Sequence, residues 1–102
     1  MVVAFSVAPT QTPGRDAEMA DAVARAVAVV RASGLPNETN AMFTLIEGEW
    51  DEVMAVIKEA SEAVLAASPR VSLVLKADIL PGHSNQLRGK VESVEKRLKG
   101  EE

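Results

Sequence analysis

The stretch Met42–Met54 constrains the fold of this chain more than any other part of the sequence. Apolar and β-branched residues around Thr44 predict a short strand, because the run is too short for a helix. Gly48 interrupts this run, and from Trp50 onward the apolar residues recur at helical spacing. We therefore expect a strand to pass into a helix within roughly two residues.

The rest of the chain predicts three further strands and two further helices. The expected elements are a strand over Val2–Ala8, a loop over Pro9–Gly14, a helix over Asp16–Ala32, an edge strand or extended segment over Leu35–Asn40, the junction strand, a helix over Trp50–Ala67, a strand over Val71–Ile79, a turn over Leu80–His83 and a last helix that Ser84 could cap. This βαββαβ order with an added C-terminal helix is typical of an α+β, ferredoxin-like antiparallel sheet. Since 102 residues have room for one core, residues 1–102 are expected to form a single domain.

Apolar residues predict which surfaces of these elements are buried. The helices carry three apolar stripes: Met19, Val23, Ala26, Val27 and Val30 in the first, Val53, Val56, Ile57, Ala60 and Val64 in the second, and a narrower one of Leu87, Val91, Val94 and Leu98 in the last. The sheet face that the helices would leave bare offers Val2, Ala4, Ser6, Val74 and Lys76. A face this apolar usually contacts a partner, so we expect a homo-oligomer that the last helix helps to close.

Composition argues against several classes of function. The chain has no cysteine, and its one histidine, His83, lies in the predicted turn. This excludes cysteine- or histidine-based metal sites and argues against an enzyme. A net charge of −4 argues against a nucleic-acid partner, because phosphate binding requires a basic surface. No signal-peptide pattern and no apolar run of roughly 20 residues is present, so we expect a cytoplasmic location and no membrane partner.

Four carboxylates, those of Glu47, Glu49, Asp51 and Glu52, crowd the junction between the strand and the helix. The helix dipole favours acidic residues in the first turn, which explains Asp51 and Glu52, and Glu49 suits the cap position. Glu47 lies in the strand and is not explained in this way. A metal site is a third interpretation, but carboxylates at adjacent helix positions point in different directions. We therefore expect no metal.

Trp50 and Glu47 each allow two interpretations. A tryptophan at a helix start is most often a core side chain, whereas an aromatic or Met42 wall beside the Glu47 carboxylate would suit an organic cation with N–H donors. The polar run that includes Asn37 and Asn40 is either a solvated edge or part of a ligand site.

The junction sequence Thr44-x-Ile46-Glu47-Gly48-Glu49-Trp50-Asp51-Glu52-Val53-Met54-x-Val56-Ile57-Lys58 resembles the signature of the small thiamine-binding protein family. The segments Phe5-Ser6-Val7-x-Pro9 and Ser33-Gly34-Leu35 are also similar to that family. The resemblance implies a ferredoxin-like fold, dimers paired into a homotetramer, and binding of thiamine or its hydroxymethylpyrimidine precursor as a ligand, with no cofactor and no catalysis.

For the ligand that the resemblance implies, residue type and strand position suggest a site in which Glu47 accepts from the exocyclic amine while hydroxyl and amide groups meet the ring nitrogens. The candidate residues are Ser6, Asn37, Asn40, Met42, Thr44, Glu47 and Trp50. Simple alternation puts Thr44 and Glu47 on opposite faces of their strand, so a bulge near Gly48 would be needed to bring both to one ligand.

At Ala41 and Phe43 the chain departs from the family pattern, which often has Pro and Gly there, and Phe43 would narrow a pocket beside Thr44. A second interpretation stays open. In it the chain is a structural or regulatory oligomeric module without a small-molecule ligand, and the acidic junction only caps a helix.

Overall fold

The computed structural model describes residues 1–10 and 16–100 and confirms the predicted α+β, ferredoxin-like fold. Its elements are β1 (Val2–Pro9), α1 (Asp16–Ala32), β2 (Asn37–Thr39), β3 (Thr44–Glu47), α2 (Trp50–Leu65), β4 (Val71–Asp78) and α3 (Gln86–Leu98). Pro9 closes β1 instead of opening the expected loop, and residues 11–14 of that loop lie outside the described part. No helix in the described ranges has both the length and the apolar character of a membrane span.

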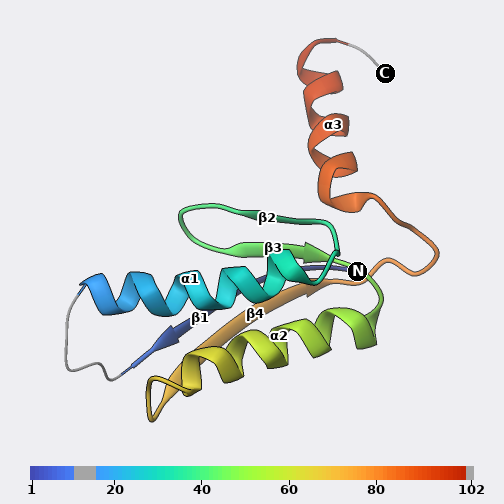
Figure 1. Cartoon of the computed structure of the whole chain (residues 1–102). Helices are drawn as coiled ribbons and strands as arrows, with labels where there is room; N and C mark the ends of the chain where they lie inside the picture. Colours follow the sequence, from blue (N-terminus) through green and yellow to red (C-terminus); the bar gives the residue numbers. More distant parts are fainter. Residues whose placement is uncertain (11–15, 101–102) are drawn as a thin grey trace.

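The four strands form one antiparallel sheet in the order β2-β3-β1-β4. β1 lies inside the sheet, paired with β3 on one side and with β4 on the other, while β2 forms an edge as the Pro36 segment predicts. Figure 1 shows α1 and α2 side by side across one face of this sheet. The arrangement has two layers, with the hydrophobic core between the helices and the sheet.

The core is built from alternate residues of β1 and from the apolar stripe of α2. Four of the five residues predicted for that stripe are buried, and Val56 is partly buried. The stripe predicted for α1 is wrong in part, because Met19 and Val23 are 38% and 40% exposed. The buried residues are Val3, Phe5 and Val7 of β1, Ala22, Ala26 and Val30 of α1, Ile46 of β3, and Val53, Ile57, Ala60 and Val64 of α2. Thus α1 turns small side chains toward its neighbours, which lets the helices and the sheet pack closely.

The opposite face of the sheet is not covered by α1 or α2. The register places Val2, Ala4 and Ser6 opposite Asp78, Lys76 and Val74 on this face, as the alternation predicts. Val74 is 57% exposed. Helix α3 starts at one end of this face and extends away from the sheet (Figure 1). The Cα radius of gyration is 15.4 Å, whereas a compact chain of this length has about 13 Å.

Substitution of Ile57 tests the packing between α2 and the sheet. Ile57→Ala should lower the free energy of unfolding by about 2–5 kcal/mol, because it leaves a cavity at a side chain that is 2% exposed. Lys58→Ala, on the exposed side of the same helix, should change it by less than about 0.5 kcal/mol. Urea unfolding followed by circular dichroism measures both. Equal losses in the two variants would contradict the assignment of this core.

Candidate functional site

The junction between β3 and α2 forms as the sequence predicts. β3 ends at Glu47 and α2 begins at Trp50, with Glu49 at the N-cap, where its backbone N–H donates to Oε1 of Glu52 at 3.1 Å. A Cβ on Gly48 would lie 3.2 Å from Val53 Cγ2, so the chain passes close to the core at this turn. Glycine at this position gives the strand room to turn directly into the helix.

Trp50 is not a core side chain, so that interpretation is wrong. The residue is 54% exposed, while the buried stripe of α2 begins three residues later at Val53. At about 100° per residue, Trp50 lies on the same side of α2 as Val53 and Ile57, so its exposure follows from its place at the very start of the helix, before the buried stripe begins. Trp50 therefore stands at the surface of the junction.

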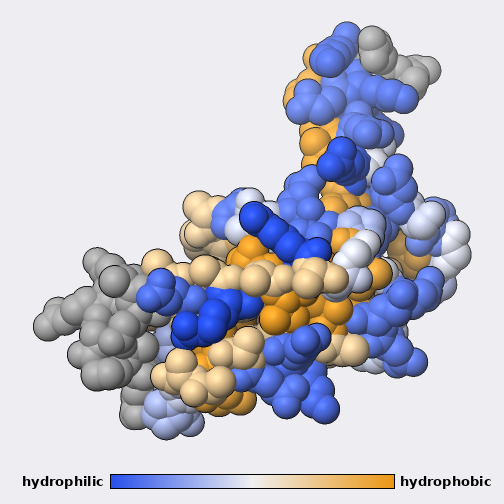
Figure 2. Space-filling model, in the orientation of Figure 1, coloured by the Kyte–Doolittle hydropathy of each residue, from blue (hydrophilic) through white to orange (hydrophobic). Residues whose placement is uncertain are grey.

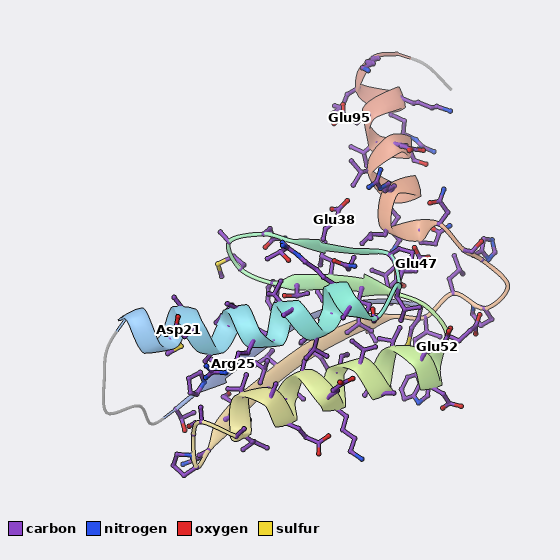
Figure 3. All side chains as sticks on the ribbon, in the orientation of Figure 1. Asp21, Arg25, Glu38, Glu47, Glu52 and Glu95 are labelled. Carbon is purple, nitrogen blue, oxygen red and sulfur yellow. The ribbon has the colours of Figure 1, made fainter. Side chains whose placement is uncertain are left out.

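Glu47 has an explanation that local sequence could not supply: it caps α3. Its Oε2 accepts a hydrogen bond from the backbone N–H of Gln86 at 2.8 Å, and its Oε1 accepts one from Leu87 at 3.0 Å. Glu47 is 6% exposed, and Figure 3 shows it at the base of α3. The first N–H groups of a helix have no partner within the helix, and a carboxylate is stabilised there by the helix dipole.

The expectation that Ser84 caps this helix is wrong. The N-cap is Asn85, with φ 57° and no capping bond from its own side chain. Asparagine tolerates this left-handed conformation better than most residues, which suits the sharp entry into α3. Because Glu47 reaches the free N–H groups from β3, the helix does not need a local serine cap.

Two ion pairs also hold the first turns of α3. Nε of Arg88 lies 3.9 Å from Oε1 of Glu38 in β2, and the Lys90 ammonium group pairs with the carboxylate of Asp78 at the end of β4. Both pairs are substantially exposed, so each contributes little to stability alone. Together with Glu47 they anchor the start of α3 to three strands.

The pairing between β1 and β3 separates Thr44 from Glu47. Val2 lies opposite Glu47 and Phe5 lies opposite Thr44, with the two residues between them paired in regular order. This segment therefore has no bulge to bring the two side chains together. Thr44 shares the face of the buried Phe5, and Glu47 lies on the uncovered face, at the other end of the strand.

A pocket lies beside Thr44, the first residue of β3, where the antiparallel neighbour β1 extends beyond β3. β1 pairs with β3 only as far as Phe5, whereas its pairing with β4 extends to Pro9. The pocket has a volume of about 240 Å³ and is formed by β1, α1 and the turn from β2 to β3. Four of the predicted residues line it: Ser6, Asn40, Met42 and Thr44. The pocket is also lined by residues that the sequence did not indicate as site residues: Thr39 and, from α1, Val23, Ala26 and Val27.

Most side-chain hydrogen-bonding groups that line this pocket are not used by the fold. In residues 1–10 and 16–100, the hydroxyls of Ser6, Thr39 and Thr44 make no hydrogen bond with the protein, and neither does the Nδ2 group of Asn40. Asn40 uses its Oδ1 to accept from the backbone N–H groups of Met42 and Phe43, each at 2.9 Å. That pair of bonds fixes the turn and leaves the amide donor available for a ligand.

The other three predicted residues do not line this pocket. Asn37 donates from Nδ2 to the carbonyl of Leu35 at 2.8 Å, a bond that supports the entry into β2. Glu47 and Trp50 line two separate hollows, of about 270 and 170 Å³. No three His, Asp or Glu side chains gather as metal ligands anywhere in the described ranges.

Comparison with known proteins gives a consistent result. A family model described as "Thiamine-binding protein" matches residues 3–95. The UPF0045 protein Mb1933 of Mycobacterium bovis is 50% identical over 99 residues, which cover 96% of this chain and 94% of that protein. The chain belongs to the thiamine-binding protein family.

Solved structures agree with this membership. The crystal structure of the hypothetical protein MJ1052 from Methanocaldococcus jannaschii superposes with a TM-score of 0.81 at 32% identity, over 92% of this chain and 94% of that one. A Thermotoga maritima protein (TM0486), provisionally assigned to thiamine biosynthesis or salvage, superposes with a TM-score of 0.77 at 25% identity, over 91% and 96% of the two chains. The family match and the structural match therefore agree on the fold.

Replacing Glu47 by glutamine tests its role as the cap of α3. Glu47→Gln keeps the size of the side chain but leaves one backbone N–H facing an amide nitrogen, so it should cost about 1–3 kcal/mol. Hydrogen exchange should accelerate most at the amides of Gln86 and Leu87. Glu49→Gln, at the exposed N-cap of α2, is the control and should leave these two amides unchanged. Unchanged protection in Glu47→Gln would contradict the capping role.

Proposed function

We propose that the pocket beside Thr44 binds the aminopyrimidine ring that thiamine and hydroxymethylpyrimidine share, and that it does so without catalysis. Membership of the thiamine-binding family supports this class of ligand. The observation that carries the proposal is the set of unused hydrogen-bonding groups in the pocket, contributed by Ser6, Thr39, Asn40 and Thr44. Polar groups that serve no purpose in the fold are available to orient a ligand.

The chemistry of the lining matches an aminopyrimidine. Hydroxyls both donate and accept, so Ser6 and Thr44 can meet ring nitrogens or the exocyclic amine, while Asn40 Nδ2 can only donate. Beyond Phe5 the backbone of β1 has no partner on the β3 side, which adds N–H and C=O groups to the same wall. The apolar wall, with Phe5, Val27 and Phe43, suits the faces of a planar ring.

The pocket favours the neutral half of thiamine over its charged half. None of the described residues that line it carries a charge, so the pocket offers no carboxylate to a thiazolium cation. Its volume of about 240 Å³ lies below the range of about 300–1,000 Å³ that is usual for ligand sites, and Phe43 occupies part of the wall. We therefore propose that the pyrimidine enters the pocket while the thiazolium of thiamine stays at its mouth.

Binding without chemical change is consistent with the same lining. The hydroxyls of Ser6 and Thr44 are weak nucleophiles unless a base activates them, and none of the described lining residues is a base. The proposed role is that of a carrier or sensor of the ligand.

We also propose that the protein self-associates, as a homotetramer built from dimers in the manner that the family resemblance implies. Large apolar side chains are exposed on the bare sheet face and on α3, among them Val74, Val91 and Val94. Surfaces of this kind are usually covered by a partner. Self-association is compatible with ligand binding. If the chain self-associates but binds no ligand, its role is that of a structural module.

Loss of one hydroxyl tests the pocket. Thr44→Val preserves shape and should weaken binding of hydroxymethylpyrimidine by about 1 kcal/mol, the value of one hydrogen bond, which is about fivefold in Kd. Thr10→Val is the matched control, because the Thr10 hydroxyl bonds the carbonyl of Arg70 outside the pocket. Isothermal calorimetry measures both. No heat from wild-type protein with either thiamine or hydroxymethylpyrimidine would contradict the function.

Fluorescence of the chain's one tryptophan tests where the ligand binds. Trp50 does not line the pocket beside Thr44 and stands at the opposite end of β3. Saturating hydroxymethylpyrimidine should therefore leave the intensity and the wavelength of its emission unchanged, although calorimetry records binding. A saturable change with the calorimetric Kd would move the site to the junction of Glu47 and Trp50.

A further inference from the structure

Helix α3 exposes an apolar stripe that its own domain does not cover. Among its residues only Leu87 is buried, while Val91, Val94 and Leu98 are 59%, 56% and 77% exposed. These four residues recur at spacings of four, three and four, so they lie on one side of the helix. Figure 2 shows hydrophobic surface running along α3 between hydrophilic side chains.

A helix in this situation is not stable by its own hydrogen bonds. Isolated helices shorter than roughly 12–15 residues are marginal in water, and most helices in proteins depend on packing of an apolar side. Here the contacts with the domain are confined to the first turns, through Glu47, Leu87, Arg88 and Lys90. The last two turns need a surface that this copy of the chain does not provide.

The uncovered sheet face has the character that such a stripe requires. Val2, Ala4, Leu45 and Val74 share this face in the register of the sheet. Thirteen residues of helix are about 20 Å long, and the eight residues of β1 span about 26 Å. The exposed stripe from Val91 to Leu98 takes up about 12 Å of that helix, so it is long enough to cover about half of the strand's length.

Charge also favours this pairing over contact between two α3 helices. Residues 83–102 carry five Lys and Arg against four Glu, a net charge of +1. Residues 1–82 carry six Lys and Arg against eleven Asp and Glu, a net charge of −5. Two such segments have the same sign and gain no electrostatic attraction from each other, whereas this segment and the body of another copy have opposite signs and attract.

We infer that α3 of one copy packs its Val91–Val94–Leu98 stripe on the uncovered sheet face of a second copy, in a two-fold exchange of helices. α3 cannot cover its own sheet, because its anchors at Glu47, Glu38 and Asp78 hold its start at the end of the face and it points away (Figures 1 and 3). Reciprocal exchange buries both faces and both stripes, as two-fold interfaces do. The inference rests on the proposed self-association and is independent of the proposed ligand.

Engineered cysteines test this contact directly, because the chain has none of its own. A tagged Val74→Cys variant is unfolded and refolded together with untagged Val94→Cys, oxidised, and separated by non-reducing electrophoresis. Ser93→Cys is the matched control, since Ser93 is exposed on α3 but lies off the stripe. Circular dichroism confirms that each variant refolds.

The expected result is that the 94–74 disulfide forms several-fold faster than the 93–74 disulfide. Equal rates, or Val94→Cys homodimers that form faster than the mixed pair, would overturn the inference, the latter in favour of contact between two α3 helices. Light scattering of the wild-type chain separates the two proposals. A mass of 10.8 kDa at micromolar concentration would refute self-association as a whole, whereas a larger mass without 94–74 cross-linking would refute only the exchange of α3.

Discussion

The regular pairing of β3 with β1 separates the pocket beside Thr44 from the carboxylate of Glu47. Because Val2 faces Glu47 and Phe5 faces Thr44 without a bulge between them, the four residues of β3 present different chemistry at their two ends and on their two faces. The Thr44 end opens into a pocket because β1 extends further than β3. The Glu47 end carries a buried carboxylate on the uncovered face, where it binds α3.

This separation divides the acidic junction into parts with different roles. Glu49 and Glu52 cap α2 locally, and Glu47 caps α3 across 39 and 40 residues of sequence. Each carboxylate oxygen of Glu47 already accepts one backbone hydrogen bond, and the side chain is only 6% exposed, so a ligand amine has little access to it. Glu47 therefore has a structural role, and we propose that ligand recognition falls to the hydroxyl and amide groups that the fold leaves unused.

Local patterns predicted much of the fold because they reflect local physics. The stripe of α2, the alternation of β1 and the Pro36 edge strand follow from periodicity and backbone constraints, whereas β4 is exposed along most of its length on both faces. Contacts between distant segments could not be predicted in this way. Asn85 in a left-handed conformation, the capping of α3 from β3 and the exposure of Trp50 depend on how elements meet in space. The same holds for the α1 wall of the pocket, which no spacing within one element reveals.

We propose that ligand recognition and helix capping occupy opposite ends of β3. Backbone amide chemical shifts of ¹⁵N-labelled protein, recorded during titration with hydroxymethylpyrimidine, test it most directly. We expect saturable changes in the chemical shifts of Ser6–Ala8 and Asn40–Thr44, while the chemical shifts of the Trp50, Gln86 and Leu87 amides stay unchanged. Shifts concentrated at those three amides, with Asn40–Thr44 unaffected, would contradict it.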